Sequence, residues 1–373
     1  MDKPYPTDPA VEVTLDLLVD SDSFWQRLQA DIAAARKRIY IQTLSFEGDR
    51  TGKMLAREVM ASSAQDKRII IDAYTKYVLS DKFRYSPKNW FDGDLRREHR
   101  ETKEMTAVLQ SDGTQVRFVN PMGPLLVHMP ARNHKKIIVI DDTVSYIGGI
   151  NFSDHNFLWH DLMLRIDSAA IADFLANDFL TSWDGGRFAG QCRSDGIELL
   201  SFDGKTNATA FEAILGLIDR ARSSVYVQSP YLSHPFTDRL RDAVQRGVHV
   251  TVVTPRDNNK KPIQEYILWE AARSGFDLRL YHKSMTHMKA MLIDETYLII
   301  GSCNFDYFSY RFEEETVAVV TDRGTIAEFI ERIINEDDGW CDQASLSSGG
   351  FKGNLRAFQI KSLGRIMSLF NGR

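Results

Sequence analysis

Short apolar runs alternate with amphipathic stretches along most of this chain. The stretch 26–36 has helical periodicity and precedes the apolar run 39–43, and the stretch 213–222 precedes the similar run 225–229. Further elements follow in the same order in both halves: helices 52–61 and 236–247, strands 68–73 and 249–254, and later a strand followed by a helix within 162–183 and 316–335. Strands that alternate with helices predict an α/β fold.

A motif repeat lies within this alternation. The spacing His-x-Lys-x4-Asp-x6-Gly-(Gly/Ser)-x-Asn occurs twice, and each position of the second copy lies 153 residues after its counterpart. The copies consist of His134, Lys136, Asp141, Gly148, Gly149 and Asn151, and of His287, Lys289, Asp294, Gly301, Ser302 and Asn304. Six positions that recur at one offset, five of them with the same residue, indicate two related halves.

Each motif begins on a predicted strand, where side chains two positions apart share a face. Each histidine and its lysine therefore point into the same site, and an apolar strand, a turn and a second strand follow. The Gly and Ser positions are small enough for the backbone to approach a ligand closely. Asp141 and Asp294 stand at the turns, where we expect them to hold each hairpin through local hydrogen bonds.

This spacing resembles the signature of the phospholipase D superfamily, with both copies intact. The resemblance implies an enzyme in which one neutral imidazole attacks a phosphodiester and forms a phosphohistidine. The other imidazole, protonated, donates to the leaving alkoxide and then acts as base. Family precedent makes His134 the nucleophile and His287 the acid and base, although the symmetry of the halves leaves the reverse assignment open. Opposite protonation states predict a bell-shaped pH–rate profile.

The other motif residues complete this chemistry. Lys136 and Lys289 supply positive charge, and Asn151 and Asn304 supply amide donors, for the charge that develops on the equatorial phosphate oxygens. We therefore expect no metal ion and no cofactor.

Each histidine also needs an acidic partner to orient it. The family places an acid at the head of the strand that follows the motif, and Glu315 precedes the apolar run 316–320 there. We therefore expect Glu315 to bind His287. Asp161, close before its own apolar run, is the matching partner expected for His134. The plain alternative for both acids is a charge at a strand entrance.

The order of elements and the resemblance together predict the architecture. Two phospholipase D-like α/β/α sandwiches are expected to face each other about a pseudo-twofold axis, with the active site at their interface. The N-terminal half is expected at 1–190 with an insertion at about 75–130, the C-terminal half at 191–344, and a Ser/Gly linker with a basic amphipathic tail at 345–373. The Gly-rich stretch 184–194 is expected to link the halves. One chain holds both half-sites, so a monomer suffices for activity.

Composition narrows the class of protein. The 373 residues are 43% hydrophobic and 26% charged, as in a globular protein. Three cysteines without metal-ligand spacing suit a reducing compartment. The sequence shows no signal peptide, and no apolar run reaches the ~20 residues that span a bilayer. We expect a cytoplasmic protein, peripheral at the inner face of the membrane, and the net charge of −5 argues against a dedicated nucleic-acid binder.

Two basic segments bear on the substrate. The insertion makes the first half 33 residues longer and mixes basic and aromatic residues at 82–100. This mixture suits an anionic headgroup or single-stranded nucleic acid, and a solvated helix is the plain alternative because nearby acids offset the charge. The tail 351–373 has five basic and no acidic side chains, a pattern typical of an anchor on an anionic membrane. A helix packed against the domains is the alternative there.

Within the superfamily, residues 35–335 are most similar to bacterial cardiolipin synthases, on segments that include Arg132-Asn133-His134-Lys135-Lys136, Trp159-His160-Asp161 and Gly301-Ser302-Cys303-Asn304. The resemblance implies a phosphatidyltransferase. A phosphatidylglycerol-like donor would lose its headgroup alcohol, and a lipid alcohol would accept the phosphatidyl group. With water as acceptor the same site is a phospholipase D hydrolase. The alternatives are a nucleic-acid phosphodiesterase of the same superfamily and a lipid-binding scaffold without activity.

Overall fold

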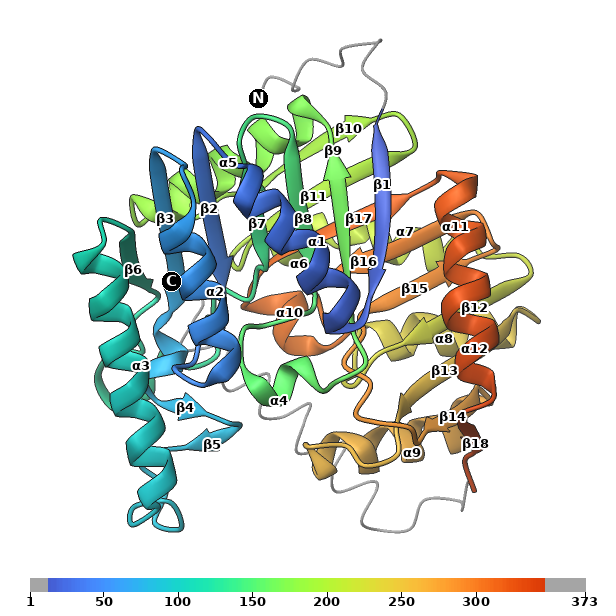
Figure 1. Cartoon of the computed structure of the whole chain (residues 1–373). Coiled ribbons are helices and arrows are strands. Elements are labelled where there is room, and N and C mark those ends of the chain that lie inside the picture. The colour runs from blue at the N-terminus through green and yellow to red at the C-terminus, as the bar shows by residue number, and fades with distance from the viewer. Residues whose placement is uncertain (1–12, 346–373) are drawn as a thin grey trace.

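Two mixed β-sheets stand side by side in the computed structural model of this chain, which describes residues 13–345 (Figure 1). The first sheet has the strand order β1-β9-β8-β7-β2-β3-β6. Its strands are β1 Thr14–Val19, β2 Arg38–Thr43, β3 Asp66–Asp72, β6 Gln115–Val119, β7 Ile137–Ile140, β8 Val144–Gly148 and β9 Leu162–Asp167. The predicted basic tail lies outside the described residues.

The second sheet repeats the first and extends it at both edges. Its order is β10-β11-β17-β16-β15-β12-β13-β14-β18, in which β11 takes the place of β1 and β14 that of β6. Its strands are β10 Gly190–Ser194, β11 Ile197–Asp203, β12 Ser224–Gln228, β13 His249–Pro255, β14 Asp277–Tyr281, β15 Ala290–Ile293, β16 Tyr297–Gly301, β17 Glu314–Val320 and β18 Cys341–Gln343. The matching orders confirm the expected α/β fold of two related halves.

Helices enclose the two sheets and create three buried cores. One core lies under α1 and α2, a second under α7, α8 and α9, and the third joins the two sheets around α5 and α11. The α-helices are α1 Asp20–Ala34, α2 Arg50–Ala61, α3 Gly93–Ser111, α4 Asp154–Phe157, α5 Ala169–Trp183, α6 Asn207–Ala210, α7 Glu212–Arg220, α8 Phe236–Gln245, α9 Lys261–Ser274, α10 Tyr307–Arg311, α11 Arg323–Phe329 and α12 Glu336–Asp338. Two short 3-10 helices are η1 Ala73–Lys76 and η2 Pro124–Leu126, and η3 Ile330–Asn335 is a π-helix. Within residues 13–345, no helix combines the length and the apolar character that crossing a bilayer requires.

The continuous apolar runs of the sequence become the central strands. Every residue of β7 and of β15 is buried, because each sheet carries helices on one face and the shared core on the other. Side chains of β7 and β15 enter the shared core together with α5, which fixes the two sheets relative to each other. The two motif strands therefore belong to one rigid centre.

The segment between β3 and β6 differs from its counterpart between β13 and β14. Both contain one crossover helix, α3 or α9, so the helical part of the predicted insertion belongs to the repeat. The extra residues build η1, the hairpin of β4 Val78–Leu79 and β5 Lys82–Phe83, and the stretch around η2. The expected linker is also shorter than predicted, because its last five residues form β10 and pair with β11.

Asp141 and Asp294 fasten the motif turn to a distant segment. The carboxylate of Asp294 accepts hydrogen bonds from the backbone amides of Arg222, Ser223 and Ser224 at 2.9, 2.8 and 3.0 Å. Asp141 accepts the equivalent amides at the start of β2. The expectation of local hairpin bonds is therefore wrong, since each acid joins the turn to the neighbouring strand that precedes it by many residues.

Replacing Asp294 with Asn is expected to destabilise the protein by about 1 kcal/mol, because charged acceptors are worth more than neutral ones and solvent partly screens this site. Burial opposes ionisation, but the amides of Ser224, Ser223 and Arg222 outweigh it and lower the pKa of Asp294 to about 2. The stabilisation is therefore complete above the ordinary carboxyl pKa and is lost as the pH falls toward about 2. Urea unfolding at several pH values measures both effects.

Asp142→Asn is the matched control for this experiment. Asp142 lies in the equivalent turn and is exposed, and its ion pairs within residues 13–345 are with Lys37 and Arg38. Its replacement is expected to cost less than about 0.5 kcal/mol. Equal losses for the two variants would contradict the role assigned to Asp294.

Candidate active site

The two motif histidines open onto one cavity. His134 stands shortly before β7 and His287 shortly before β15, at equivalent places of the two sheets. Both line a cavity of about 360 Å³ together with Asn151 and Asn304. The fold thus brings side chains that are 153 residues apart in the sequence to the same space.

Each histidine is oriented by a carboxylate from the other half. Nδ1 of His134 lies 3.1 Å from Oε1 of Glu315, and Nδ1 of His287 lies 2.7 Å from Oδ2 of Asp161. Both acids contact a motif histidine, but the predicted pairing is wrong, because Glu315 was expected on His287 and Asp161 on His134. A carboxylate on Nδ1 fixes the ring and leaves Nε2 to meet a substrate.

Two backbone bridges between the halves explain this crossing. The amide of His134 donates to the carbonyl of Glu314 at 2.9 Å, and the amide of His287 donates to the carbonyl of His160 at 2.7 Å. Each bridge sets a motif histidine beside the residue that precedes the acid of the opposite half. The acid side chain therefore reaches across the interface to the ring.

Lys136 and Lys289 place two ammonium groups beside the motif histidines. Nζ of Lys136 donates to the carbonyl of His134 at 2.7 Å, and Nζ of Lys289 lies 2.7 and 2.9 Å from the two ring nitrogens of His287. Burial lowers the pKa of Lys136 to about 8 and that of Lys289 to about 7. Desolvated ammonium groups of this kind gain from a bound anion, since an anion restores favourable interactions for the charged form.

Both histidines favour the neutral form at neutral pH. Burial and then the ammonium of Lys136 lower the pKa of His134 well below its ordinary value, and burial and then Lys289 do the same for His287. The expected opposite protonation states therefore stay a prediction for the substrate-bound enzyme. A substrate phosphodiester would bring negative charge that raises both pKa values, so a protonated acid can arise when the substrate binds.

In each motif copy, the small residue that follows the second strand leaves space for the carboxylate that orients a histidine. A Cβ atom on Gly149 would stand 2.3 Å from Oδ1 of Asp161. In the second copy Ser302 replaces this glycine, and its hydroxyl donates to Glu315. The hydroxyl of Ser309 donates to Glu315 as well, at 2.7 Å. Space for a carboxylate, rather than the expected close approach to a ligand, accounts for this position.

The remaining motif residues shape the strand edge and the cavity. A Cβ atom on Gly148 or Gly301 would stand 2.4 or 2.2 Å from a carbonyl oxygen of the next strand. The amide nitrogen of Asn151 donates to a neighbouring asparagine at 2.9 Å. The side-chain oxygen of Asn304 is buried and has no hydrogen-bond partner among the described residues. Both asparagines line the cavity, so their amides can still reach a substrate.

Residues outside the motif add charge and ring surfaces to the cavity. Lys260, directly before α9, places its Nζ 3.9 Å from the ring centroid of Tyr231, and both residues line the cavity. The ring of Trp159 lies 4.8 Å from that of His287. Lys260 and Tyr231 could not be identified from the sequence, because no local spacing connects them to the motif. Trp159 stood within the family-like segments but without an assigned role.

One group at the site has the spacing of metal ligands. Ligand atoms of His134, Glu313 and Glu315 lie within 4.8 Å of one another. The ammonium groups of Lys136 and Lys289 act on the same carboxylate of Glu315, so a cation would have to compete with them. This environment suits an orienting acid, and the expectation of no metal stays a prediction. A second such group consists of Glu47, Asp49 and Glu98.

Comparison with known proteins agrees with this fold. Residues 28–183 and 214–337 match the family described as "Cardiolipin synthase, PLD-like domain", and the chain belongs to this family. The protein is therefore an enzyme of the phospholipase D superfamily.

Individual relatives support the same conclusion at low identity. The chain is 22% identical over 357 residues to the major cardiolipin synthase ClsA of Bacillus subtilis, which covers 87% of this chain and 68% of that protein. It is 25% identical over 353 residues to cardiolipin synthase 2 of Staphylococcus epidermidis, with 86% and 67% covered. The solved structure of phosphatidylserine synthase from Haemophilus influenzae Rd KW20 matches with a TM-score of 0.70 and 14% identity over 96% of this chain and 94% of that chain. At this identity the structural likeness shows the fold alone.

The crossed pairing predicts which imidazole responds to which acid. Glu315→Gln is expected to shift the ring nitrogen resonances of His134, because their Nδ1 partner changes, and to leave those of His287 nearly unchanged. Asp161→Asn is expected to do the reverse. Nitrogen-15 NMR of labelled histidine measures both, with turnover expected to fall on the order of 10²–10⁴-fold in each variant. A Glu315→Gln variant that mainly shifts His287 would refute the pairing.

The lysine pKa values predict an alkaline decline in kcat/KM. Lys136 and Lys289 carry charge below pKa values of about 8 and about 7, and raising the pH through this range removes the charges that attract an anionic substrate. Lys289→Arg should move the decline to higher pH, since guanidinium stays charged. A pH profile of kcat/KM for both proteins tests this, and an unmoved alkaline limb would contradict it.

Proposed function

We propose that this protein is a cardiolipin synthase-like phosphatidyltransferase that works through a phosphohistidine intermediate. The observation that carries the proposal is the pair of crossed histidine–carboxylate contacts at one cavity, flanked by two buried lysines. This arrangement supplies a nucleophile, an acid and base, and positive charge for the phosphate, which are the groups that a two-step transfer needs. Both histidine–carboxylate pairs form within one chain, so a monomer would suffice for activity.

The first step would cleave the donor. Nε2 of His134 attacks phosphorus, and the bond from phosphorus to the headgroup oxygen breaks. His287 donates its proton to the leaving alkoxide, while Glu315 stabilises the positive charge that develops on His134. Lys136 and Lys289 balance the charge on the equatorial oxygens.

The second step would reverse the same roles. An incoming alcohol gives its proton to His287, its oxygen attacks phosphorus, and the bond from phosphorus to His134 breaks. Asp161 holds the ring of His287 in place through both proton transfers. With water as the incoming nucleophile, the product would be phosphatidic acid.

Apolar side chains around the cavity favour a lipid substrate over nucleic acid. Met129 and Phe308 line the cavity, and Met129 is partly exposed. Leu158, beside the lining residue Trp159, is 76% exposed. Such exposed apolar groups suit contact with acyl chains. We propose a phosphatidylglycerol-like donor, a lipid alcohol acceptor, and a peripheral position at the cytoplasmic face of an anionic membrane.

Incubation of the purified protein with phosphatidylglycerol vesicles tests the activity. Mass spectrometry is expected to show cardiolipin and free glycerol, whereas phosphatidic acid alone would indicate a hydrolase. His249→Asn, an exposed histidine away from the cavity, is the matched control and should keep full activity. Cleavage of single-stranded DNA without any lipid product would overturn the proposal in favour of a nucleic-acid phosphodiesterase.

A donor with a nitrophenol leaving group separates the roles of the two histidines. An acidic phenol departs without protonation, so His287→Asn is expected to release one burst of phenol per enzyme and then stop. His134→Asn should release none, because no covalent intermediate can form. Rapid-mixing absorbance records the burst. A burst from His134→Asn and none from His287→Asn would show that His287 is the nucleophile and His134 the acid and base.

A further inference from the structure

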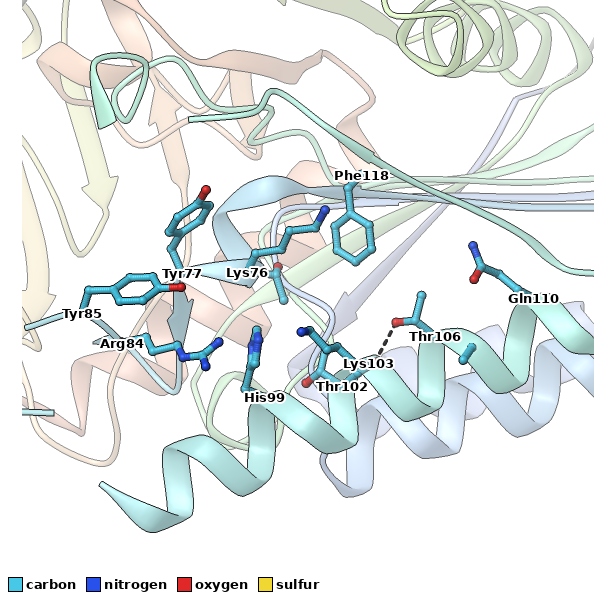
Figure 2. A pocket seen from close by; sticks show the side chains of 12 residues that line it. Lys76, Tyr77, Arg84, Tyr85, His99, Thr102, Lys103, Thr106, Gln110 and Phe118 are labelled. Carbon is cyan, nitrogen blue, oxygen red and sulfur yellow. Dashed lines mark hydrogen bonds between the residues drawn. The ribbon is translucent and has the colours of Figure 1, made fainter. Parts of the chain in front are cut away.

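A second cavity lies next to the catalytic cavity, on the other side of the segment 74–78. Its volume is about 490 Å³, and it lies between η1, the hairpin region and one face of α3 (Figure 2). Tyr74 and Val78 line the catalytic cavity, whereas Thr75 and Tyr77, from the same segment, line the second one. The two cavities are therefore separated by a single stretch of backbone.

The second cavity carries positive charge without an acidic counterpart. Its lining includes Lys76, Arg84, His99 and Lys103 and no Asp or Glu. Among residues 13–345, none of these four takes part in an ion pair. Arg97, on the same helix as His99 but outside the lining, is paired with carboxylates at 2.9 and 3.8 Å. Arg96 and Arg100, also on this helix and outside the lining, have no ion pair within residues 13–345 either, so what distinguishes the cavity is that its cations line one space without a carboxylate.

His99 provides independent support for a ligand. Its side chain is 9% exposed, points toward the cavity, and has no hydrogen-bond partner within the described part of the chain (Figure 2). Burial, and then the charges of Arg84 and Lys103, lower the pKa of His99 to about 4. Burial and Lys103 also lower the pKa of Lys76. A polar ring that is held neutral by its burial and then by nearby cations marks a place where an anion would be stabilised.

Aromatic rings complete the lining. Nζ of Lys76 lies 4.0 Å from the ring centroid of Phe118, and the guanidinium of Arg84 lies 5.5 Å from that of Tyr85. Lysine and arginine are the usual ligands of phosphate oxygens, and aromatic faces accept the apolar part of the same molecule. The cavity thus suits a ligand that has both a phosphate group and an apolar portion.

We propose that this cavity is a second, non-catalytic site that binds the phosphate group of a phosphate-bearing ligand through Lys76, Arg84 and Lys103. The ligand is either a phospholipid headgroup or a soluble phosphate ester, since both present the same charged oxygens. The site does not depend on the reaction proposed above, because binding can be measured without turnover.

The full-length protein is titrated with inorganic phosphate, and separately with phosphatidylcholine vesicles that contain or lack phosphatidylglycerol. The readout is the NMR resonance of the His99 ring, assigned through His99→Gln, because it reports this cavity and not the catalytic histidines. Saturable shifts are expected, together with a rise in the pKa of His99 from about 4. Saturation by inorganic phosphate without a response to the vesicles identifies a soluble ligand, and saturation by phosphatidylglycerol vesicles identifies a lipid headgroup.

Two triple variants make the test specific. Lys76→Gln, Arg84→Gln and Lys103→Gln together are expected to weaken binding at least about tenfold, because charged hydrogen bonds to phosphate are lost. The control removes the same charge outside the lining and should bind like the wild type; it combines Lys88→Gln, Arg97→Gln and Arg100→Gln. Equal weakening in both variants, or no response of His99 to either probe, would overturn the proposal.

Discussion

The active site depends on two contacts that cross the interface between the halves, from His134 to Glu315 and from His287 to Asp161. Neither half can orient its own histidine, so a productive site requires both sheets at a fixed separation. The core shared by the two sheets, built around α5 and α11, supplies that rigidity. Catalytic geometry and fold are therefore linked, because the same apolar contacts that join the halves also set the distance between the rings.

The buried ion pairs next to the first motif position the chain around His134 more than they stabilise the fold. Arg132 donates to Asp72 at 2.8 Å, and Lys135 donates to Asp178 at 2.7 Å, with almost no exposure of any of the four side chains. Burial raises the pKa of Asp72 to about 7 even though Arg132 opposes the shift. Removing paired charges from water costs about as much as their attraction returns. What these pairs contribute is position, since they hold the chain on both sides of His134.

Much of the fold could be predicted because its signals are local. Fully buried strands such as β7 and β15 appear as continuous apolar runs, and the repeated motif aligns the two halves without further information. The predicted insertion at 75–130 includes α3, which the structure shows to be the counterpart of α9. The two helices differ in composition, although both connect equivalent strands. Only the sheet order shows that they are counterparts.

Most residues of the site could be predicted from the sequence, but not which of them contact one another. The sequence identified both acids, yet their partners depend on backbone bridges between segments that are far apart, and these bridges leave no local pattern. Lys260 was missed for the same reason, since a lysine before a helix is common and only the tertiary fold directs it into the cavity. Asp294 was assigned to the turn in which it lies, whereas its hydrogen bonds reach the start of β12.

A crystal structure of the protein with bound tungstate, a stable mimic of the phosphate in transfer, tests the central claim most directly. We predict a single oxyanion bonded to Nε2 of one motif histidine and within hydrogen-bond distance of the other ring and both lysines. Separate ions, each held by one half alone, would contradict the account of one shared site.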